Sequence, residues 1–179
     1  VYEVIPVYAR NPFRLTQHLE RLQNSLDATG IANPASLDDW QAIIWQAIAC
    51  QAQDNQWVYI QISRGLSMRD LACPPTDSPP TVLVMSNPLH TPSSQLLATG
   101  VSAVTANDNR WQRCDIKTTS LLPNVLLRQQ STQAQAAETI LLRDGFLTEG
   151  TSSNVFIVKD GRLIAPPKSH LILPGVTYD

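Results

Sequence analysis

The sequence predicts an α+β fold in two domains, with helices and short strands in separate runs along the chain. Three observations lead to this prediction: runs of alternating apolar residues, stretches with the 3.6-residue apolar period of amphipathic helices, and proline-rich breaks between them. The chain has 179 residues, 43% of them hydrophobic, which is enough to bury a core in one large or two small domains.

Residues 1–9 are predicted to form a strand, because apolar residues alternate along VYEVIPVYA. Asn11 and Pro12 would supply a helix cap and a first-turn proline, so a helix is expected to follow and to run to about Ala28. Its predicted core stripe consists of Leu15, Leu19, Leu22 and Leu26.

A second helix is predicted to begin at Ser36, which makes a capping-box-like pair with Asp39, and to end near Gln53. Its buried side is expected to comprise Leu37, Trp40, Ile44 and Ile48. Strands are predicted at 57–63 and 81–86, on either side of the proline-rich loop CPPTDSPP.

Residues 87–94, NPLHTPSS, are interpreted as an interdomain linker, because they contain two prolines and no apolar periodicity beyond Leu89. This interpretation places a small α+β domain at residues 1–88 and a second domain at 89–179. Both domains are expected to be incomplete, because Val1 already lies within a strand and the sequence stops just after PGVTYD.

The second half is predicted to contain strands at 100–105 and 113–117, then a helix from Ser120 to about Ala136. Short strands follow. Two of them flank the tight-turn sequence KDG and are expected to pair as a hairpin, at residues 156–158 and 162–165.

Composition excludes several classes of function. A net charge of -2 gives no electrostatic basis for binding nucleic acid. No window approaches the roughly 18 apolar residues of a membrane span, and no secretory n-region or h-region opens the chain. The sequence therefore predicts a protein with neither nucleic-acid nor membrane partners.

Cysteine and histidine usage indicates neither a disulfide framework nor a metal site. The three cysteines, Cys50, Cys73 and Cys114, are odd in number and widely spaced, which favours a reducing cytoplasm. The histidines are too scattered for a metal site or a catalytic triad, and surface or packing roles are expected for His18, His90 and His170.

Only three lysines occur, and one of them stands out. Lys159 lies in a turn sequence and Lys168 in a loop sequence, so both are expected to be solvated. Lys117 follows the apolar residues Cys114 and Ile116 and precedes an apolar helix. Burial would lower its pKa and free a nucleophilic amine; the alternative is a lysine at a strand end with its ammonium in water.

Several segments occur in the order found in one enzyme family: VYEVIPVY, HLERL, YIQISRG, DIKTTSLLPNVL, and ILLRDGFLTEGTSSNVFIVKDGRLIAPPKSHLILPGVT. Together they resemble the pyridoxal 5'-phosphate (PLP) dependent aminotransferases of fold class IV. The pattern is closer to the D-amino-acid (D-alanine) aminotransferases than to the branched-chain enzymes. The resemblance covers essentially the whole chain and implies a two-domain α+β fold, in which residues 89–179 form the first part of the larger cofactor-binding domain.

The resemblance implies that Lys117 holds PLP through a Schiff base and, once displaced by the incoming amino acid, transfers the α-proton. Glu149 of the TEG element would bond the pyridine nitrogen and stabilise the protonated ring. Without the neighbouring motifs, Glu149 would be interpreted as an exposed acid beside a glycine turn.

The resemblance also implies a set of weaker cofactor contacts. Arg21 of HLERL matches the family's phosphate-binding arginine, and Val176 and Thr177 match a turn that surrounds the phosphate. Leu173 corresponds to a leucine packed behind the ring. Two further possible contacts, which in isolation would satisfy their own turn backbone, are Ser152 and Asn154.

On the substrate side, Tyr2 matches a tyrosine that reaches the catalytic lysine and the substrate carboxylate, and Glu138 aligns with an acid behind the site. Arg69 of SMRDLACP matches an arginine that binds the α-carboxylate from the neighbouring subunit. The family's histidine two residues later is replaced by Leu71, which removes a charge-assisted contact worth about 1.5–3 kcal/mol.

The resemblance thus implies a homodimeric PLP-dependent aminotransferase with composite active sites, and the cysteine usage favours a cytoplasmic location. Its substrates would be a D-amino acid and a 2-oxo acid, and its kinetics ping-pong. The alternatives of the same fold are a branched-chain aminotransferase and an aminodeoxychorismate lyase. The alternative from another class is a PLP-free binding or structural derivative.

Overall fold

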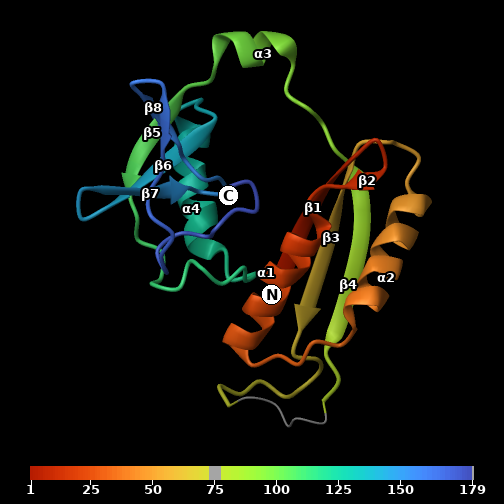
Figure 1. Cartoon of the computed structure of the whole chain (residues 1–179). Coiled ribbons are helices and arrows are strands. Elements are labelled where there is room, and N and C mark those ends of the chain that lie inside the picture. The colour runs from red at the N-terminus through yellow and green to blue at the C-terminus, as the bar shows by residue number, and fades with distance from the viewer. Residues whose placement is uncertain (73–77, 179) are drawn as a thin grey trace. The chain divides into compact units, whose positions relative to one another are not determined.

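The computed structural model describes residues 1–72 and 78–178, so five residues of the proline-rich loop, Cys73 among them, lie outside the described part. The chain divides into two compact units (Figure 1). The first comprises Val1–Thr91 with Lys117–Thr119, and the second comprises Pro92–Ile116 with Ser120–Asp179.

The first unit is an antiparallel sheet covered by two helices. The sheet has the strand order β2-β1-β3-β4. The helices are α1 (Leu15–Thr29) and α2 (Leu37–Cys50). The strands are β1 (Tyr2–Tyr8), β2 (Asn11–Pro12), β3 (Gln56–Ser63) and β4 (Thr81–Pro88).

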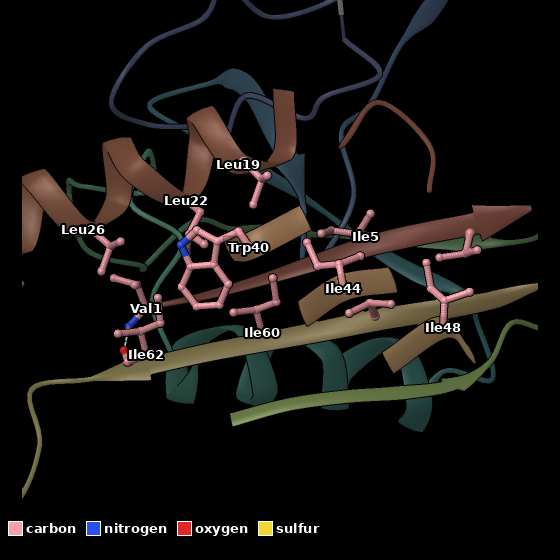
Figure 2. Close-up of a cluster of buried hydrophobic side chains, with 12 residues drawn as sticks. Val1, Ile5, Leu19, Leu22, Leu26, Trp40, Ile44, Ile48, Ile60 and Ile62 are labelled. Atoms are coloured by element: carbon pink, nitrogen blue, oxygen red, sulfur yellow. Dashed lines mark hydrogen bonds between the residues drawn. The ribbon is translucent and has the colours of Figure 1, made fainter. Parts of the chain in front are cut away.

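One face of this sheet and one stripe of each helix form the core (Figure 2). Alternate residues of β1 and β3 point to the helices, as the two-residue period of a strand requires. The predicted stripe of α1 is confirmed, with Leu15 partly buried at its margin, whereas Leu37 of α2 is exposed. The twelve buried members are Val1, Ile5, Val7, Leu19, Leu22, Leu26, Trp40, Ile44, Ile48, Val58, Ile60 and Ile62.

The second helix begins as predicted. Ser36 accepts a hydrogen bond from the backbone N–H of Asp39 at 3.2 Å, and the Asp39 carboxylate accepts one from the backbone N–H of Ser36. This reciprocal capping box satisfies two donors at the start of α2. The helix ends at Cys50, slightly earlier than expected.

The predicted start of the first helix is wrong. Asn11 and Pro12 form β2, which pairs with the end of β1, and α1 begins only at Leu15. Ala9 and Arg10 have positive φ values of 47° and 64° and turn the chain back on itself. The Arg10 side chain stabilises this turn by donating to the carbonyls of Ile48, Gln51 and Ala52 at the end of α2.

The described part of the second unit contains two small sheets and two helices. The parallel pair β5 (Ala103–Asn107) and β6 (Glu138–Arg143) is extended by the antiparallel strand β7 (Phe146–Gly150). Strands β8 (Ile157–Lys159) and β9 (Arg162–Ile164) form the predicted hairpin, in which Asp160 and Gly161 have positive φ values of 51° and 72°. The helices are α3 (Ser94–Thr99) and α4 (Leu122–Gln133).

The strand predicted at 113–117 is not formed. A hydrogen bond from the backbone N–H of Ile116 to the carbonyl of Arg113 closes a turn there. The two apolar residues of this segment, Cys114 and Ile116, are nevertheless buried. Their spacing of two residues fits a turn as well as a strand, so the pattern alone could not distinguish the two. Helix α3 was also not predicted, because its single turn and a half carries no buried residue.

Candidate active site

Lys117 is attached to the first unit through its backbone. Its N–H donates to the hydroxyl of Ser25 on α1 at 3.2 Å, and its carbonyl accepts from the N–H of Tyr2 at 3.0 Å. Lys117 is half-buried, whereas the other two lysines, Lys159 and Lys168, are exposed. The strand β1 and the helix α1 therefore determine together where the one half-buried lysine of the described residues lies.

The Lys117 side chain lies against an aromatic pair. Its Nζ is 4.5 Å from the centroid of the Tyr2 ring, within the range of a cation–π contact. The Tyr2 ring stacks on Tyr59 of β3 with centroids 5.7 Å apart. Burial raises the pKa of the Tyr2 phenol, with a further contribution from the charge of Glu3. Tyr2 therefore presents a neutral hydroxyl beside the lysine at neutral pH.

A buried acid, Glu3, holds the arginine that was predicted to bind phosphate. The Glu3 carboxylate accepts hydrogen bonds from Arg21 Nε at 2.9 Å and Nη2 at 2.6 Å, and His18 Nδ1 lies 3.0 Å from its Oε1. Burial acts to raise the pKa of Glu3, but the hydrogen bonds from His18 and Arg21 and the charges of Arg21 and Lys117 outweigh it and bring that pKa to about 2. Glu3 is therefore a carboxylate across the physiological range.

The sequence explains this cluster in retrospect. Glu3 shares the inward phase of β1 with Ile5 and Val7, a position where a strand normally carries an apolar residue. His18 and Arg21 are three residues apart and so lie on one face of α1. An acid at an inward position, opposite a helix carrying a basic residue, was the available signal that sequence reasoning missed.

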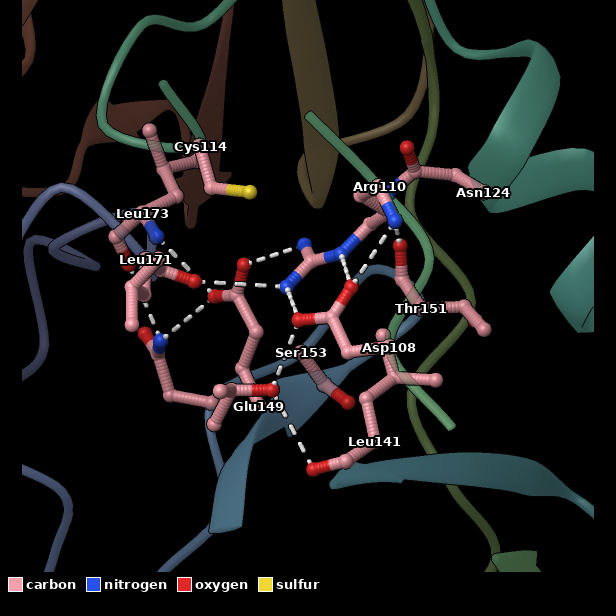
Figure 3. A network of polar contacts seen from close by, with 12 residues as sticks. Asp108, Arg110, Cys114, Asn124, Leu141, Glu149, Thr151, Ser153, Leu171 and Leu173 are labelled. Carbon is pink, nitrogen blue, oxygen red and sulfur yellow. Dashed lines mark hydrogen bonds and ion pairs between the residues drawn. The ribbon is translucent and has the colours of Figure 1, made fainter. Parts of the chain in front are cut away.

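In the second unit, Glu149 lies at the end of β7 with 6% of its side chain exposed. Its Oε1 accepts from Arg110 Nη1 at 2.5 Å, and its Oε2 accepts from Asn154 Nδ2 at 3.2 Å and from the backbone N–H of Leu173 at 3.0 Å (Figure 3). Burial raises the pKa of the Glu149 carboxyl, and Arg110 and the Leu173 N–H oppose this effect without cancelling it.

Arg110 is itself fixed by a second acid. Asp108 accepts from its Nε and Nη2, both at 2.9 Å, in a bidentate pair. Asp108 also contacts Arg143 at 3.1 Å and accepts from the Thr148 hydroxyl at 3.0 Å. Burial works against ionisation of Asp108, but the hydrogen bonds from Arg110 lower its pKa to about 2. Neither Asp108 nor Arg110 was predicted, because the run NDNRWQR has the composition of a solvated loop.

Asn154 joins Glu149 to the PGVT turn. Its Nδ2 donates to the Leu173 carbonyl at 2.9 Å as well as to Glu149, and its Oδ1 accepts from the Gly175 N–H at 3.1 Å. A side chain at Gly175 would collide with that oxygen, since an added Cβ would lie 2.2 Å from it. Val176 and Thr177 lie at the centre of the turn, which is closed by the Tyr178 N–H donating to the Gly175 carbonyl.

Glu138, at the start of β6, holds the loop after Glu149. It accepts from the hydroxyls of Thr151 and Ser153 at 2.5 and 2.7 Å. Gly150 permits this approach, because a Cβ there would lie 2.3 Å from Ser153 Oγ. Ser152, between the two, is exposed.

The predicted substrate loop lies apart from these clusters in sequence and shows little burial. Arg69 is exposed, and Leu71 is 99% exposed. Arg64 instead donates to the carbonyls of Thr29 and Gly30 and so satisfies the end of α1.

The predicted residues thus gather in two clusters. In the first unit they are Tyr2, Arg21 and Lys117, joined by Glu3. In the second unit they are Glu149, Asn154 and Leu173, joined by Arg110, with Glu138 holding the adjoining loop.

A separate pocket of about 520 Å³ opens in the second unit. Its lining is mainly apolar and includes Phe146, Ile157, Ile164, Pro166 and Ile172. None of the predicted site residues lines it. Within residues 1–72 and 78–178, no helix is long and apolar enough to cross a membrane, and no group of three metal-ligating side chains occurs.

Each cluster, taken by itself, offers residue types that suit groups of PLP. A carboxylate offers about four lone-pair positions, and the three donors to Glu149 among the described residues leave one on Oε1 for a further N–H donor such as a protonated pyridine. The half-buried Lys117 offers an amine, and Arg21 offers a guanidinium held in place by Glu3. These residue types match an aldehyde, a ring nitrogen and a phosphate, respectively.

Comparisons with known proteins identify the family of the chain. The family profile described as amino-transferase class IV matches residues 1–179. The chain is 37% identical over 177 residues to D-alanine aminotransferase from Bacillus licheniformis and 33% identical over 177 residues to D-alanine aminotransferase from Staphylococcus epidermidis. Each match covers 99% of this chain but only 62% of the relative, so the chain spans less than two thirds of the length of these relatives.

Solved structures show the same fold. A branched-chain amino acid aminotransferase from Escherichia coli superposes with a TM-score of 0.85 at 24% identity, covering 99% of this chain and 62% of that one. The PLP-bound form of a hypothetical aminotransferase from Mycobacterium tuberculosis superposes with a TM-score of 0.77 at 25% identity, covering 99% and 64%.

Proposed function

The chain belongs to the class IV aminotransferases, and from this premise we propose that the full-length protein transfers an amino group between a D-amino acid and a 2-oxo acid, with PLP as its cofactor. The observation that carries the proposal is the position of Lys117. It is half-buried and fixed by the backbone of Tyr2 and the hydroxyl of Ser25, while Lys159 and Lys168 are exposed.

We assign the following roles to residues of this chain. The Lys117 amine would hold the cofactor through a Schiff base and, once released by the incoming amino acid, would serve as the base that takes up and returns the substrate's α-proton. Bound PLP supplies an electron sink for the negative charge at the α-carbon. Tyr2 lies against the Lys117 ammonium and would orient the amine.

The remaining roles concern binding. Glu149 would accept a hydrogen bond from the pyridine nitrogen, and Arg21 would bind the phosphate with its guanidinium held by Glu3. In the PGVT turn, Val176 and Thr177 would contribute phosphate contacts. Leu173 would pack against the ring, whereas Asn154 is engaged with Glu149 and Gly175, which favours a supporting role over direct contact. Ser152 stays a possible contact.

The D-amino-acid assignment is supported by two relatives of 37% and 33% identity that are D-alanine aminotransferases. Arg69 would bind the substrate carboxylate, and Leu71 leaves it without a neighbouring imidazole. A branched-chain aminotransferase or an aminodeoxychorismate lyase would share the fold, and a PLP-free derivative is the alternative outside catalysis. Measuring transamination of both enantiomers of each candidate donor, by the full-length protein, decides among them.

The lysine assignment has a direct test. Borohydride reduction of the full-length protein with PLP, followed by peptide mapping, should place the pyridoxyl group on Lys117. Lys168→Arg should keep the visible absorption of bound PLP, and Lys117→Arg should lose it. Label on Lys159 or Lys168 in the wild-type protein would contradict the assignment, and the absence of any label would favour the PLP-free alternative.

We further propose that Arg69 acts across a two-fold interface, so that the functional unit is a homodimer with composite sites. Mixing Lys117→Ala subunits with Arg69→Ala subunits should then restore part of the activity, because each hybrid dimer has one intact site. Hybrids that form but stay inactive would show that Arg69 serves its own subunit or has no role.

A further inference from the structure

The acceptor position that remains on Glu149 is next to Arg110. Among the described residues, Oε2 receives two donors, Asn154 and the Leu173 N–H, whereas Oε1 receives only Arg110 Nη1. An oxygen of a carboxylate accepts about two hydrogen bonds. A further donor would therefore share Oε1 with a guanidinium that lies 2.5 Å away.

The direction of the Arg110 side chain is fixed independently of Glu149. Asp108 holds the Nε and Nη2 edge of the guanidinium in a planar, bidentate pair, and Nη2 also reaches the Leu171 carbonyl at 3.4 Å. Because the guanidinium is planar, this leaves Nη1 pointing at Glu149 Oε1 (Figure 3). Only 5% of the Arg110 side chain is exposed, so water screens this contact little.

The charges around Glu149 balance. Asp108 and Glu149 are the acids, and Arg110 and Arg143 are the bases. The Cys114 thiol adjoins this network, and burial raises its pKa. Burial disfavours the charged form of Glu149, and Arg110 is the first of the groups that counter this effect.

We propose that Arg110 is a positioning residue that keeps the proton of the cofactor on the pyridine nitrogen, by holding Glu149 as a carboxylate and weakening Oε1 as a proton acceptor. The inference rests on the proposed function. A guanidinium on the same oxygen withdraws negative charge from it, so that the shared proton stays on the ring while the hydrogen bond is kept. Asp108 serves the same end by aiming Nη1.

The test follows the pyridine nitrogen directly. The full-length protein is reconstituted with PLP labelled with ¹⁵N in the ring, and the nitrogen resonance is compared in the wild type, Arg110→Met, Arg110→Lys and the matched control Arg113→Met. Arg113 is three residues along, 51% exposed, and paired with Asp115. The wild type and Arg113→Met should show a protonated ring nitrogen. Arg110→Met should shift toward the unprotonated value, and Arg110→Lys should shift less.

A second measurement separates positioning from a structural role. Arg110→Met should weaken PLP binding by about tenfold or more, as expected for loss of a hydrogen bond to a charged group. In a Glu149→Gln background, Arg110→Met should cause little further loss of PLP affinity, because the residue through which Arg110 acts is already altered. A purely structural arginine would lower the affinity equally in both backgrounds, which overturns the proposal.

The remaining outcomes are also decisive. An unchanged nitrogen resonance in whichever of the two Arg110 variants folds overturns the proposal, while the proposed function stands. A wild-type protein that binds no PLP at Lys117 overturns the proposed function and the inference with it.

Discussion

The two units hold their key polar groups in opposite ways. In the first unit a buried acid, Glu3, holds the cation Arg21, and in the second a buried cation, Arg110, holds the acid Glu149. In each case the residue predicted to bind the cofactor is paired with a buried partner of opposite charge. The difference shows that one physical device, a charge-assisted hydrogen bond in a shielded site, fixes either sign of charge.

The surroundings of the two pairs also differ. Glu3 shares the inward face of β1 with members of the twelve-residue apolar core, whereas Glu149 belongs to a network that includes Asp108, Arg110 and Arg143. Apolar burial provides stability at about 25 cal/mol per Å². A buried ion pair adds little net stability but is costly to break on one side. The stability of the first unit is therefore expected to depend mainly on apolar packing, and that of the second unit on the balance of its buried charges.

The largest effect is expected in the apolar core. Trp40→Ala in the full-length protein should lower the free energy of unfolding by about 3–5 kcal/mol, because Trp40 is 2% exposed and its loss leaves a cavity. Trp45, on the same helix and 45% exposed, is the matched control, and Trp45→Ala should stay within about 0.5 kcal/mol. Urea unfolding measures both. Equal losses would mean that α2 packs differently from the structure described.

The next effect separates charge from packing. Glu3→Gln should lower the free energy of unfolding by about 3 kcal/mol at neutral pH, because Arg21 and His18 lose their buried anion. Glu20→Gln, on an exposed position of α1, is the control and should change little. An unchanged free energy of unfolding in Glu3→Gln would show that water or another group replaces the carboxylate as the partner of Arg21.

The same acid predicts a pH dependence. The pKa of Glu3 is about 2 in the folded chain against an ordinary value of 4.5, so its stabilising contribution is complete above about pH 4.5 and is lost as the pH falls toward 2. That contribution amounts to roughly 3 kcal/mol, since one pKa unit corresponds to about 1.36 kcal/mol. Asp108 acts in the same direction. Glu149 acts in the opposite direction, because its raised pKa makes its ionisation costly as the pH rises.

The free energy of unfolding is measured at pH values from neutral down to about 2. It should decline less steeply with falling pH in Glu3→Gln than in the wild type. The same pH dependence of the free energy of unfolding in Glu3→Gln and the wild type would contradict the depressed pKa of Glu3. The Glu20→Gln control should follow the wild type throughout.

The smallest effect concerns helix starts. Helix α2 has a capping box, whereas α4 begins at Leu122 and its N-cap residue, Leu121, makes no side-chain capping hydrogen bond. Ser36→Ala should lower the free energy of unfolding by about 1 kcal/mol. Ser36→Thr should retain most of the wild-type stability, because Thr also accepts a hydrogen bond from the N3 N–H. A loss of the same size in both variants would point to packing and not to capping.

Sequence reasoning identified the elements whose pattern is local. The helix at 37–50 has a capping box and a 3.6-residue period, and the hairpin around Asp160 and Gly161 has a turn that its residues require. The start of α1 failed because Asn11 and Pro12 suit a helix cap and an edge strand equally, and only the turn at Ala9 and Arg10 decides between them.

The candidate site likewise contains residues that the sequence predicted and residues that it did not. The family pattern pointed to Lys117, Glu149 and Arg21, which the structure shows in polar clusters. It did not point to Arg110, because an arginine in a polar run looks like a surface residue until the fold brings Asp108 and Glu149 to it. Asp108 is only two residues from Arg110, but Glu149 is 39 residues away, so no local window shows that this pair is buried with a second acid.

Asn154 has a consequence for how such enzymes diverge. A single amide bonds the acid of β7, the Leu173 carbonyl and the Gly175 N–H. The PGVT turn and Glu149 therefore form one inherited unit: a substitution in the turn that displaces Gly175 displaces the acid as well. Substitutions are expected to be better tolerated in the exposed segment 66–72, which carries Arg69 and Leu71 and shares no hydrogen bond with that amide among the described residues. Under the role proposed for Arg69, selection could alter substrate preference in that segment while Glu149 and the PGVT turn are kept together.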